Sequence, residues 1–326
     1  MLHTAITKQW GLRYPILGAP MANVAHGRLA NAISTAGGLG MIGVGSKDSP
    51  DMIEREAAIA RGDSGATKFG IGLMAWAIEG RRDLLDAAIA QKPFLLSISF
   101  GSIEPYIDAV HRAGILLATQ VNNRRAALDA ASAGADLIVA QGTESGGHTG
   151  SVATLPLLQI VLDSVDVPVA AAGGIASPAG LAAILAAGAD AGWLGTPFLL
   201  SPEANVTDSA RGRIEKADET GTVLTSVFDR VNNLAWPRQF PGRALRNSFV
   251  EKWHGREDEL LRNEDEVTRF RKGAEARDYD VTSIYAGETV GLLSKERSAG
   301  EVVESFGGGA EQLLRKRIAQ ILSLTD

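Results

Sequence analysis

The stretch QGTESGGHTG, residues 141–150, follows an apolar run over residues 135–140 in which Asp136 is the one charged residue. A short apolar run of this kind predicts a buried strand, and the glycines after it permit a tight turn and a close approach of a ligand to the backbone. The turn begins with a polar side chain, Gln141, and presents a histidine, His148, which we expect at the tip of the loop. Loops held on a rigid scaffold are where sites concentrate, so this stretch is predicted to carry the site.

Two further glycine signals follow the next two apolar runs. Gly173 and Gly174 come after VPVAAA, and Gly195 and Thr196 come after AGWL. Three successive strand ends that finish in glycine beside a hydroxyl or an amide indicate one pocket that binds a phosphate. The alternative is that each glycine serves only the geometry of a strand-to-helix turn.

The spacing of the apolar runs predicts the fold. Eight runs recur about one strand plus one helix apart, and each but the last is followed by helical periodicity. This alternation predicts a (β/α)₈ barrel. The runs lie near Ile16, Met41, Ile71, Leu95, Leu116, Ile138, Val169 and Trp193.

Capping signals place several of the helices between these strands. Ser49-Pro50 and Ser177-Pro178 each combine an N-cap residue with a proline at the first helical position. Asn122 or Asn123 is the expected N-cap of RRAALDAASAG, and Gly37 ends the helix that begins at His26.

The composition of the chain changes after the eighth run: charged residues become more frequent and the strand-like runs stop. We interpret 203–284 as a mostly helical insertion that covers the mouth of the barrel. The barrel itself is then 1–202 and 285–326, with a final barrel helix over 310–324. Within the insertion, WPRQFPGRALRNSF carries Arg238, Arg243 and Arg246, which form either a solvated face or a cationic rim that attracts an anionic substrate.

Composition excludes several classes of function. A net charge of −6 argues against nucleic acid as a partner. The absence of cysteine excludes disulfides and thiolate chemistry, and the scattered histidines give no metal motif. No signal peptide or membrane segment is evident, because prolines and glycines interrupt the uncharged run over 167–189, and we expect a cytoplasmic protein. A homodimer remains open.

The sequence GLGMIG, residues 38–43, matches a dinucleotide fingerprint in spacing only. It follows a helix and lies within a strand-like run, whereas the fingerprint follows a strand and opens a helix. We therefore place the site at the carboxyl ends of the barrel strands, where the loops after strands seven and eight often bind phosphate. Those loops are GGIAS and GTPF, so Gly173, Gly174, Gly195 and Thr196 are the predicted phosphate contacts. A flavin mononucleotide (FMN) would fit there, with its ring near Gln141 and His148.

At this point the chain resembles a known family. APMANVA, AQGTESGGHTG, PVAAAGGIAS and GTPFLLSPE together look like the FMN-dependent nitronate monooxygenases, and the likeness extends to RNSFVEKW and YAGETVGLL. The resemblance implies oxidation of an alkyl nitronate, such as propionate 3-nitronate, by O₂ with bound FMN. It implies that His148 is the catalytic base. It also implies cofactor contacts from Ala19, Pro20, Met21, Gln141, Gly146, Gly147, Gly173, Gly174, Gly195 and Thr196.

Four positions depart from the family pattern. Gly72 in FGIGLM stands where Asn is frequent, and Ser99 in SISFG stands where many members have His. In YAGETVG, Tyr285 and Glu288 replace the common Trp and Gln. These departures bear on the substrate more than on the cofactor.

The residues alone leave the role of His148 open. A neutral imidazole can accept a proton from the acidic carbon beside a nitro group, and an imidazolium can instead stabilise an anionic nitronate. Two other functions compete with nitronate oxidation. One is an FMN-dependent enoyl-acyl-carrier-protein reductase that uses NAD(P)H, and the other is a non-catalytic barrel that binds a phosphate ligand.

Overall fold

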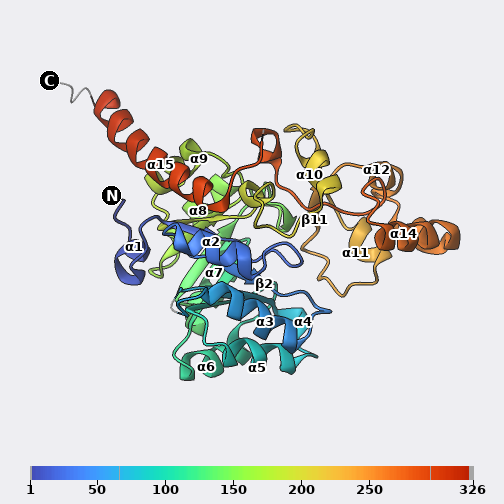
Figure 1. Ribbon diagram of the computed structural model, residues 1–326, viewed down its shortest axis with the longest axis horizontal. Helices are drawn as coiled ribbons and strands as arrows, with labels where there is room; N and C mark the ends of the chain where they lie inside the picture. The colour runs from blue at the N-terminus through green and yellow to red at the C-terminus, as the bar shows by residue number, and fades with distance from the viewer. Residues whose placement is uncertain (1, 66, 294, 323–326) are drawn as a thin grey trace.

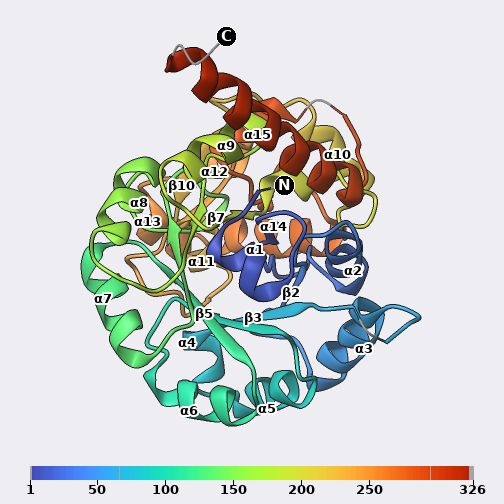
Figure 2. The ribbon, with the colours of Figure 1, turned by 90° about the vertical axis from the view of Figure 1, so that its left-hand side faces the viewer.

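The computed structural model describes residues 2–65, 67–293 and 295–322. Eight parallel strands form a sheet in the order β1-β9-β8-β6-β5-β4-β3-β2, and this sheet curls into a nearly closed barrel (Figure 2). Each strand coincides with one of the eight apolar runs, so the predicted barrel architecture is confirmed. The strands are β1 (Ile16–Gly18), β2 (Met41–Gly43), β3 (Gly70–Met74), β4 (Leu95–Ser99), β5 (Leu116–Val121), β6 (Leu137–Gln141), β8 (Val169–Ala172) and β9 (Ala191–Leu194).

The seam of the barrel lies between β1 and β2, which have no continuous ladder. An isolated parallel bridge joins Leu17 to Leu39, just before β2. The N–H of Gly18 donates to the carbonyl of Leu39 at 2.8 Å, and the N–H of Leu39 donates to the carbonyl of Ile16 at 2.9 Å. These bonds satisfy backbone groups that an open sheet would leave exposed at its edge.

Helices surround the barrel on its outer face (Figure 2). The caps expected from sequence form, because Ser49, Asn123 and Ser177 each accept a hydrogen bond from a backbone N–H in the first turn of the helix that follows. The last helix, α15 (Ala299–Ile321), packs against α9 and α2. It begins before the predicted residue 310, and positions 323 and 324 lie outside the described residues. The other helices of this layer are α2 (Gly27–Thr35), α3 (Pro50–Arg61), α4 (Ala75–Ile78), α5 (Arg82–Ala90), α6 (Glu104–Arg112), α7 (Arg124–Ala133), α8 (Thr154–Leu162) and α9 (Pro178–Ala186).

The short N-terminal helix α1 (Ala5–Trp10) closes one end of the barrel. Its Trp10 meets Phe94 edge to face, with ring centroids 5.5 Å apart, and the N–H of Ala5 donates to Asp190. Phe94 and Asp190 directly precede β4 and β9, so α1 covers the amino ends of the strands. The opposite end, where the strands finish, is left for a site.

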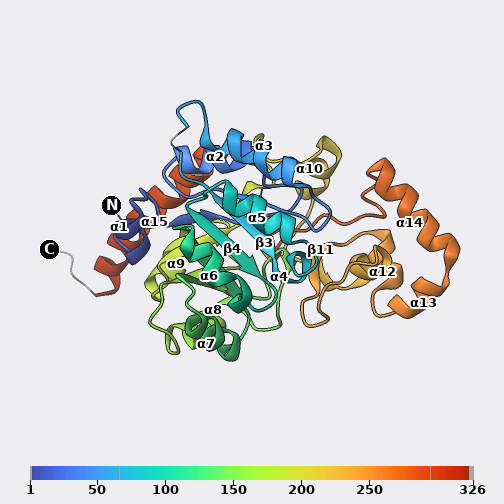
Figure 3. The ribbon, with the colours of Figure 1, turned by 90° about the horizontal axis from the view of Figure 1, so that it is seen from below.

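Most of the segment between β9 and α15 folds beside the barrel rather than around it (Figures 1 and 3). Strand-like runs were predicted to stop here, and that prediction is wrong. Strands β10 (Thr222–Thr225) and β11 (Gly242–Leu245) pair antiparallel, and β11 also pairs with β7 (Gly147–His148). Both strands are short and one includes an arginine, so neither produces an apolar run. The division at residues 203 and 284 stays a prediction. Helical elements here are η1 (Thr196–Phe198), α10 (Asp208–Ile214), α11 (Val227–Val231), α12 (Ser248–Trp253), α13 (Glu257–Arg262), α14 (Glu264–Ala276) and η2 (Glu288–Leu292).

Across the described residues, no helix is both long and apolar enough to cross a membrane.

Candidate active site

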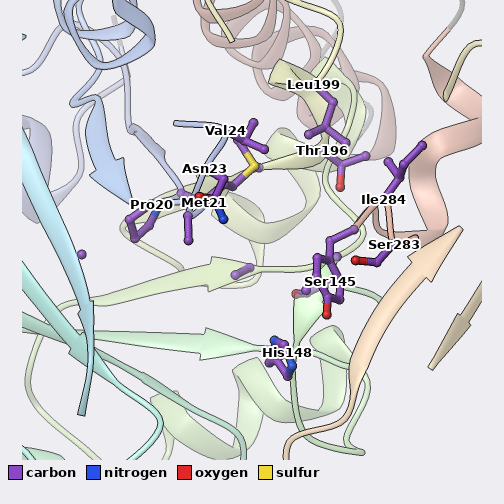
Figure 4. A pocket seen from close by; sticks show the side chains of 18 of the residues that line it. Pro20, Met21, Asn23, Val24, Ser145, His148, Thr196, Leu199, Ser283 and Ile284 are labelled. Carbon is purple, nitrogen blue, oxygen red and sulfur yellow. The ribbon is translucent and has the colours of Figure 1, made fainter. Parts of the chain in front are cut away.

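A pocket of about 560 Å³ lies at the carboxyl ends of the barrel strands. Its volume is within the usual range for small-molecule and cofactor sites. Figure 4 shows it from close by, with Pro20, Met21, Ser145 and His148 among its labelled side chains. All the residues predicted for the site line this one pocket, namely Ala19, Pro20, Met21, Gln141, Gly146, Gly147, His148, Gly173, Gly174, Gly195 and Thr196. Their individual roles stay predictions.

His148 is held in place by its backbone rather than presented on a free loop tip. It belongs to the two-residue strand β7, where it pairs with Gly242 of β11. The side-chain amide of Gln141 donates to the carbonyl of His148 at 3.0 Å. As a result the histidine is only 8% exposed. The predicted loop tip is therefore a small antiparallel sheet, which forms because β11 returns to the barrel mouth.

The side chain of His148 is paired with a carboxylate from the segment beside the barrel. Its Nε2 lies 2.9 Å from Oδ1 of Asp229, and the two side chains are 7% and 6% exposed. Asp229 lies on α11, 81 residues further along the chain. No described residue forms a hydrogen bond with Nδ1 of His148, so that nitrogen is left for a ligand.

An aromatic cluster packs against His148. The ring of Trp236 stacks on the imidazole with a centroid distance of 3.4 Å and an interplanar angle of 6°. Trp236 in turn meets Phe100 at 4.9 Å and Trp76 at 5.1 Å. These apolar rings exclude water from one face of the histidine and strengthen electrostatic interactions around it.

Unpaired donors gather at the loops after β8 and β9. Among the described residues, none accepts a hydrogen bond from the backbone N–H of Gly173, Gly174 or Gly195. The hydroxyl of Ser145 is buried and has no partner in the described chain. A buried hydroxyl without a partner is rare in native proteins, and the three glycine N–H groups beside it are at least partly open to the pocket. Together these donors can bind an anionic ligand. The hydroxyl of Thr196 accepts from the N–H of Gly287 at 2.9 Å and keeps its own proton to donate.

An acidic side chain, Glu144, lies beside these donors but is already engaged. Its carboxylate accepts from the N–H of Thr154 at 2.9 Å and from the hydroxyl of Thr154 at 2.8 Å. Thr154 is the first residue of α8, and a carboxylate at a helix N-terminus is favourable. The charge of Glu144 is therefore directed at α8, which leaves the loop donors for a ligand.

The hypothesis that Arg243 forms part of a solvated face or a cationic rim is wrong. Arg243 is buried, its Nε donates to the carbonyl of Thr143 at 2.8 Å, and its guanidinium pairs with Glu288 at 3.0 Å. Burial lowers the pKa of Arg243, and the nearby Glu288 opposes that effect. Strand β11 places the arginine inside the small sheet, so it ties the 141–150 loop to its neighbours. Arg246 is exposed and pairs with Glu251.

Two of the departures from the family pattern have a local explanation in packing. A Cβ at Gly72 would overlap the ring of Pro20, so this glycine lets the β1 loop lie against β3. Ser99 is buried and its Oγ accepts from the N–H of Gln120 at 3.0 Å.

The other two departures have partners in the site. Tyr285 lines the pocket, and its ring centroid lies 5.4 Å from that of His148. Burial, followed by the nearby charge of Asp229, raises the pKa of the Tyr285 phenol, so its hydroxyl stays protonated. Glu288 is the partner of Arg243.

Sequence reasoning missed three residues of the site. Asp229 lies in SVFDRV between Phe228 and Arg230, Trp236 lies in the stretch interpreted as a solvated face or a cationic rim, and Ser145 lies within the glycine turn. An acid close to Val227, Phe228 and Val231 was the one signal available in the sequence, and it is a weak one. Over the described residues, no group of three or more His, Cys, Asp or Glu side chains could hold a metal ion.

The fold and the site together define a barrel protein whose ligand pocket lies at the carboxyl ends of the strands and contains a buried histidine. The nitronate monooxygenase family profile matches residues 78–307. The chain therefore belongs to the nitronate monooxygenase family of oxidoreductases.

Relatives in this family have different names. A Mycobacterium tuberculosis protein named (3aS,4S,5R,7aS)-5-hydroxy-7a-methyl-1-oxo-octahydro-1H-indene-4-carboxyl-CoA dehydrogenase is 34% identical, over 77% of this chain and 68% of that protein. A nitronate monooxygenase from Neurospora crassa is 29% identical, over 92% of this chain and 90% of that protein. Among solved structures, FabK from Thermotoga maritima superposes with a TM-score of 0.85 at 30% identity, covering 98% of this chain and 100% of that chain.

Proposed function

We propose that this protein oxidises alkyl nitronates with O₂, using bound FMN, and that His148 exchanges a proton with the substrate. The observation that carries the proposal is that the buried His148 and the unpaired donors around Gly173 open into the same pocket. A phosphate-bearing cofactor can then bind at one end while a small substrate meets the imidazole.

The residues of the pocket fit FMN. A phosphate needs several donors, and the N–H groups of Gly173, Gly174 and Gly195 together with the hydroxyl of Ser145 supply them. The backbone at Pro20 and Met21 lies on the pocket wall, where it can contact a flat ring. When bound, FMN accepts electrons from the substrate and passes them to O₂.

The side chains around His148 prepare it for proton transfer. Asp229 supplies the negative charge that balances an imidazolium, and Trp236 and Phe100 keep water away from the ring face. Nδ1 is free to accept a proton from a carbon acid or to donate one to a nitronate oxygen.

The absorbance spectrum of the purified protein tests the cofactor, and anaerobic titration tests the reaction. We expect flavin absorption maxima, bleaching on anaerobic addition of an alkyl nitronate, and recovery of the colour when air is admitted. Protein that is colourless and cannot be reconstituted with FMN would contradict the proposal.

A substitution at His148 separates its two possible roles. His148→Asn should lower oxidation of a neutral nitroalkane by roughly 10² to 10⁴ if the histidine is a general base, while a preformed nitronate suffers much less. Loss of one hydrogen bond to the charged nitronate costs only about 1.5 to 3 kcal/mol. Equal loss on both substrates would assign anion binding to His148, and no loss on either would make it structural. Flavin content of the variant is the control.

A second candidate is FMN-dependent reduction of an enoyl thioester by NAD(P)H. It is favoured by the likeness to FabK over nearly the whole chain. Anaerobic bleaching of the flavin by NADH or NADPH, without bleaching by a nitronate, would support it. A protein that binds FMN and turns over neither kind of substrate would instead be a non-catalytic binding barrel.

A further inference from the structure

We infer that Asp229 is the positioning residue for His148, which it holds in the tautomer with the proton on Nε2, so that Nδ1 is the nitrogen that takes the substrate's proton. The inference rests on the proposed function, because it assigns the atom and direction of a proton transfer in that reaction. It places a positioning residue of a barrel site on a helix beside the barrel.

The tautomer follows from what a carboxylate can do. An ionised carboxylate only accepts hydrogen bonds, so a neutral imidazole whose Nε2 lies 2.9 Å from Oδ1 of Asp229 carries its proton on Nε2. Nδ1 then has a free lone pair. No described residue bonds to that nitrogen, and His148 lines the pocket.

A second side chain faces the carboxylate of Asp229. Tyr285 lies against the carboxylate, and burial together with the charge of Asp229 raises the pKa of its phenol, so the hydroxyl stays protonated as a donor. The buried cation of the small sheet, Arg243, is paired with Glu288 at 3.0 Å and bonds to the carbonyl of Thr143. Asp229 is therefore left to His148 and Tyr285.

The orientation of the pair is fixed by packing on several sides. Val227, Phe228 and Val231 of the same short helix, α11, are all buried and anchor it. Trp236 covers the face of the imidazole, and the backbone of β7 is held by β11. The edge of the ring that carries Nδ1 is the part left without a partner.

The pairing of Asp229 with His148 affects the oxidation of neutral nitroalkanes but not that of preformed nitronates. A neutral nitroalkane must transfer its α-proton to Nδ1, and the C–H electron pair becomes the C=N bond of the nitronate. The resulting imidazolium faces the carboxylate of Asp229, whose negative charge balances it. A preformed nitronate has already lost that proton, so its oxidation does not need Asp229.

Nitrogen NMR of the protein labelled with ¹⁵N-histidine tests the tautomer without any assay of activity. His148→Gln identifies the signals of His148. At mildly alkaline pH we expect Nε2 to be protonated and Nδ1 unprotonated in the holoprotein. In Asp229→Asn the amide can either donate or accept, so the fixed tautomer should be lost. Wild-type protein with the proton on Nδ1, or an unchanged spectrum in the variant, would overturn the inference.

Kinetics of the same variant test its consequence. Asp229→Asn should lower kcat for a neutral nitroalkane by about 10² or more, with little change for the preformed nitronate and no loss of FMN. Asp136→Asn is the matched control, because Asp136 pairs with His111 at the same 2.9 Å on the surface, away from the pocket. We expect this control to retain activity on both substrates.

The outcomes separate the inference from the function on which it rests. Equal loss on both substrates would show that Asp229 is only structural and would overturn the inference. Wild-type protein that oxidises neither substrate would contradict the proposed function, while the NMR measurement would still decide whether Asp229 sets the tautomer.

Discussion

Two adjacent glycines show how much the meaning of a residue depends on its surroundings. A Cβ at Gly173 would lie 2.6 Å from the hydroxyl of Thr154 and 2.7 Å from that of Ser145, so this glycine is required for packing. A Cβ at Gly174 would meet only Glu144, at 3.9 Å, and would otherwise project into open space. From the sequence, both glycines were predicted to contact one phosphate. In the structure, only Gly174 has open space for a side chain.

Gly174→Ala should weaken FMN binding while the protein still folds. The added methyl group occupies the approach to the backbone N–H of the loop. Gly174 has φ +70°, so a side chain there also costs about 1 to 2 kcal/mol of backbone strain. A branched side chain such as valine would confuse the two effects. The measurement is the flavin-to-protein ratio after gel filtration and the Kd for added FMN.

Gly114→Ala is the control for that strain. Gly114 has φ +73° and open space around it, and it follows α6 on the outside of the barrel. Both variants should lose similar stability, but only the one at position 174 should lose FMN. Full flavin content in Gly174→Ala would contradict the prediction that the phosphate binds at this loop.

At the scale of elements, the small sheet β10-β11-β7 is what joins the site to the rest of the chain. Strand β7 carries His148, and β11 supplies both its backbone partner and the buried Arg243. The arginine spans the sheet, because it bonds to Thr143 before β7, to Thr222 of β10 and to Glu288 of η2. One side chain therefore fixes several loops at the barrel mouth.

Arg243→Met should destabilise the protein by about 2 kcal/mol, the range for hydrogen bonds to a charged group. This loss of stability is smaller than the loss on breaking a fully buried ion pair, because the Glu288 side chain is 42% exposed and can be hydrated without Arg243. Urea unfolding measures the change.

The matched control is Arg246→Met, since Arg246 pairs with Glu251 on the surface with both side chains about half exposed. It should change stability by less than about 1 kcal/mol.

If Arg243 instead contacts the substrate, its replacement would raise KM for a carboxylated nitronate more than for a neutral-tailed one. We expect equal effects on the two substrates.

At the scale of the whole molecule, the pocket lies between the barrel and the segment that follows β9. Its lining includes Gly72 and Gln141 of the barrel together with Leu234, Trp236 and Tyr279 of the later segment. A ligand bound there contacts both parts of the chain, so its binding also stabilises the packing of one part against the other.

FMN should therefore raise the stability of the folded protein by mass action. At a free FMN concentration 100-fold above Kd, the unfolding free energy should rise by about 2.7 kcal/mol. Thermal unfolding of the apoprotein with increasing FMN measures this, with riboflavin, which lacks the phosphate, as the control ligand. A melting temperature that rises equally with both compounds would argue against a phosphate site.

The sequence alone determined the barrel and the place of the pocket. The eight apolar runs, the helix caps and the three glycine turns are local signals, and a parallel barrel brings the carboxyl ends of its strands to one rim. Every residue predicted for the site therefore lines one pocket, although the sequences of 19–21 and 195–196 lie far apart.

Only the tertiary structure decided what His148 contacts. Asp229 and Trp236 reach it because the segment after β9 returns to pair β11 with β7, and the same return buries Arg243 in the small sheet. Strands of four residues and a helix of five have no periodicity long enough to predict their partners. The contacts span about 80 to 90 residues of chain, so they are set by packing between elements rather than by any local pattern.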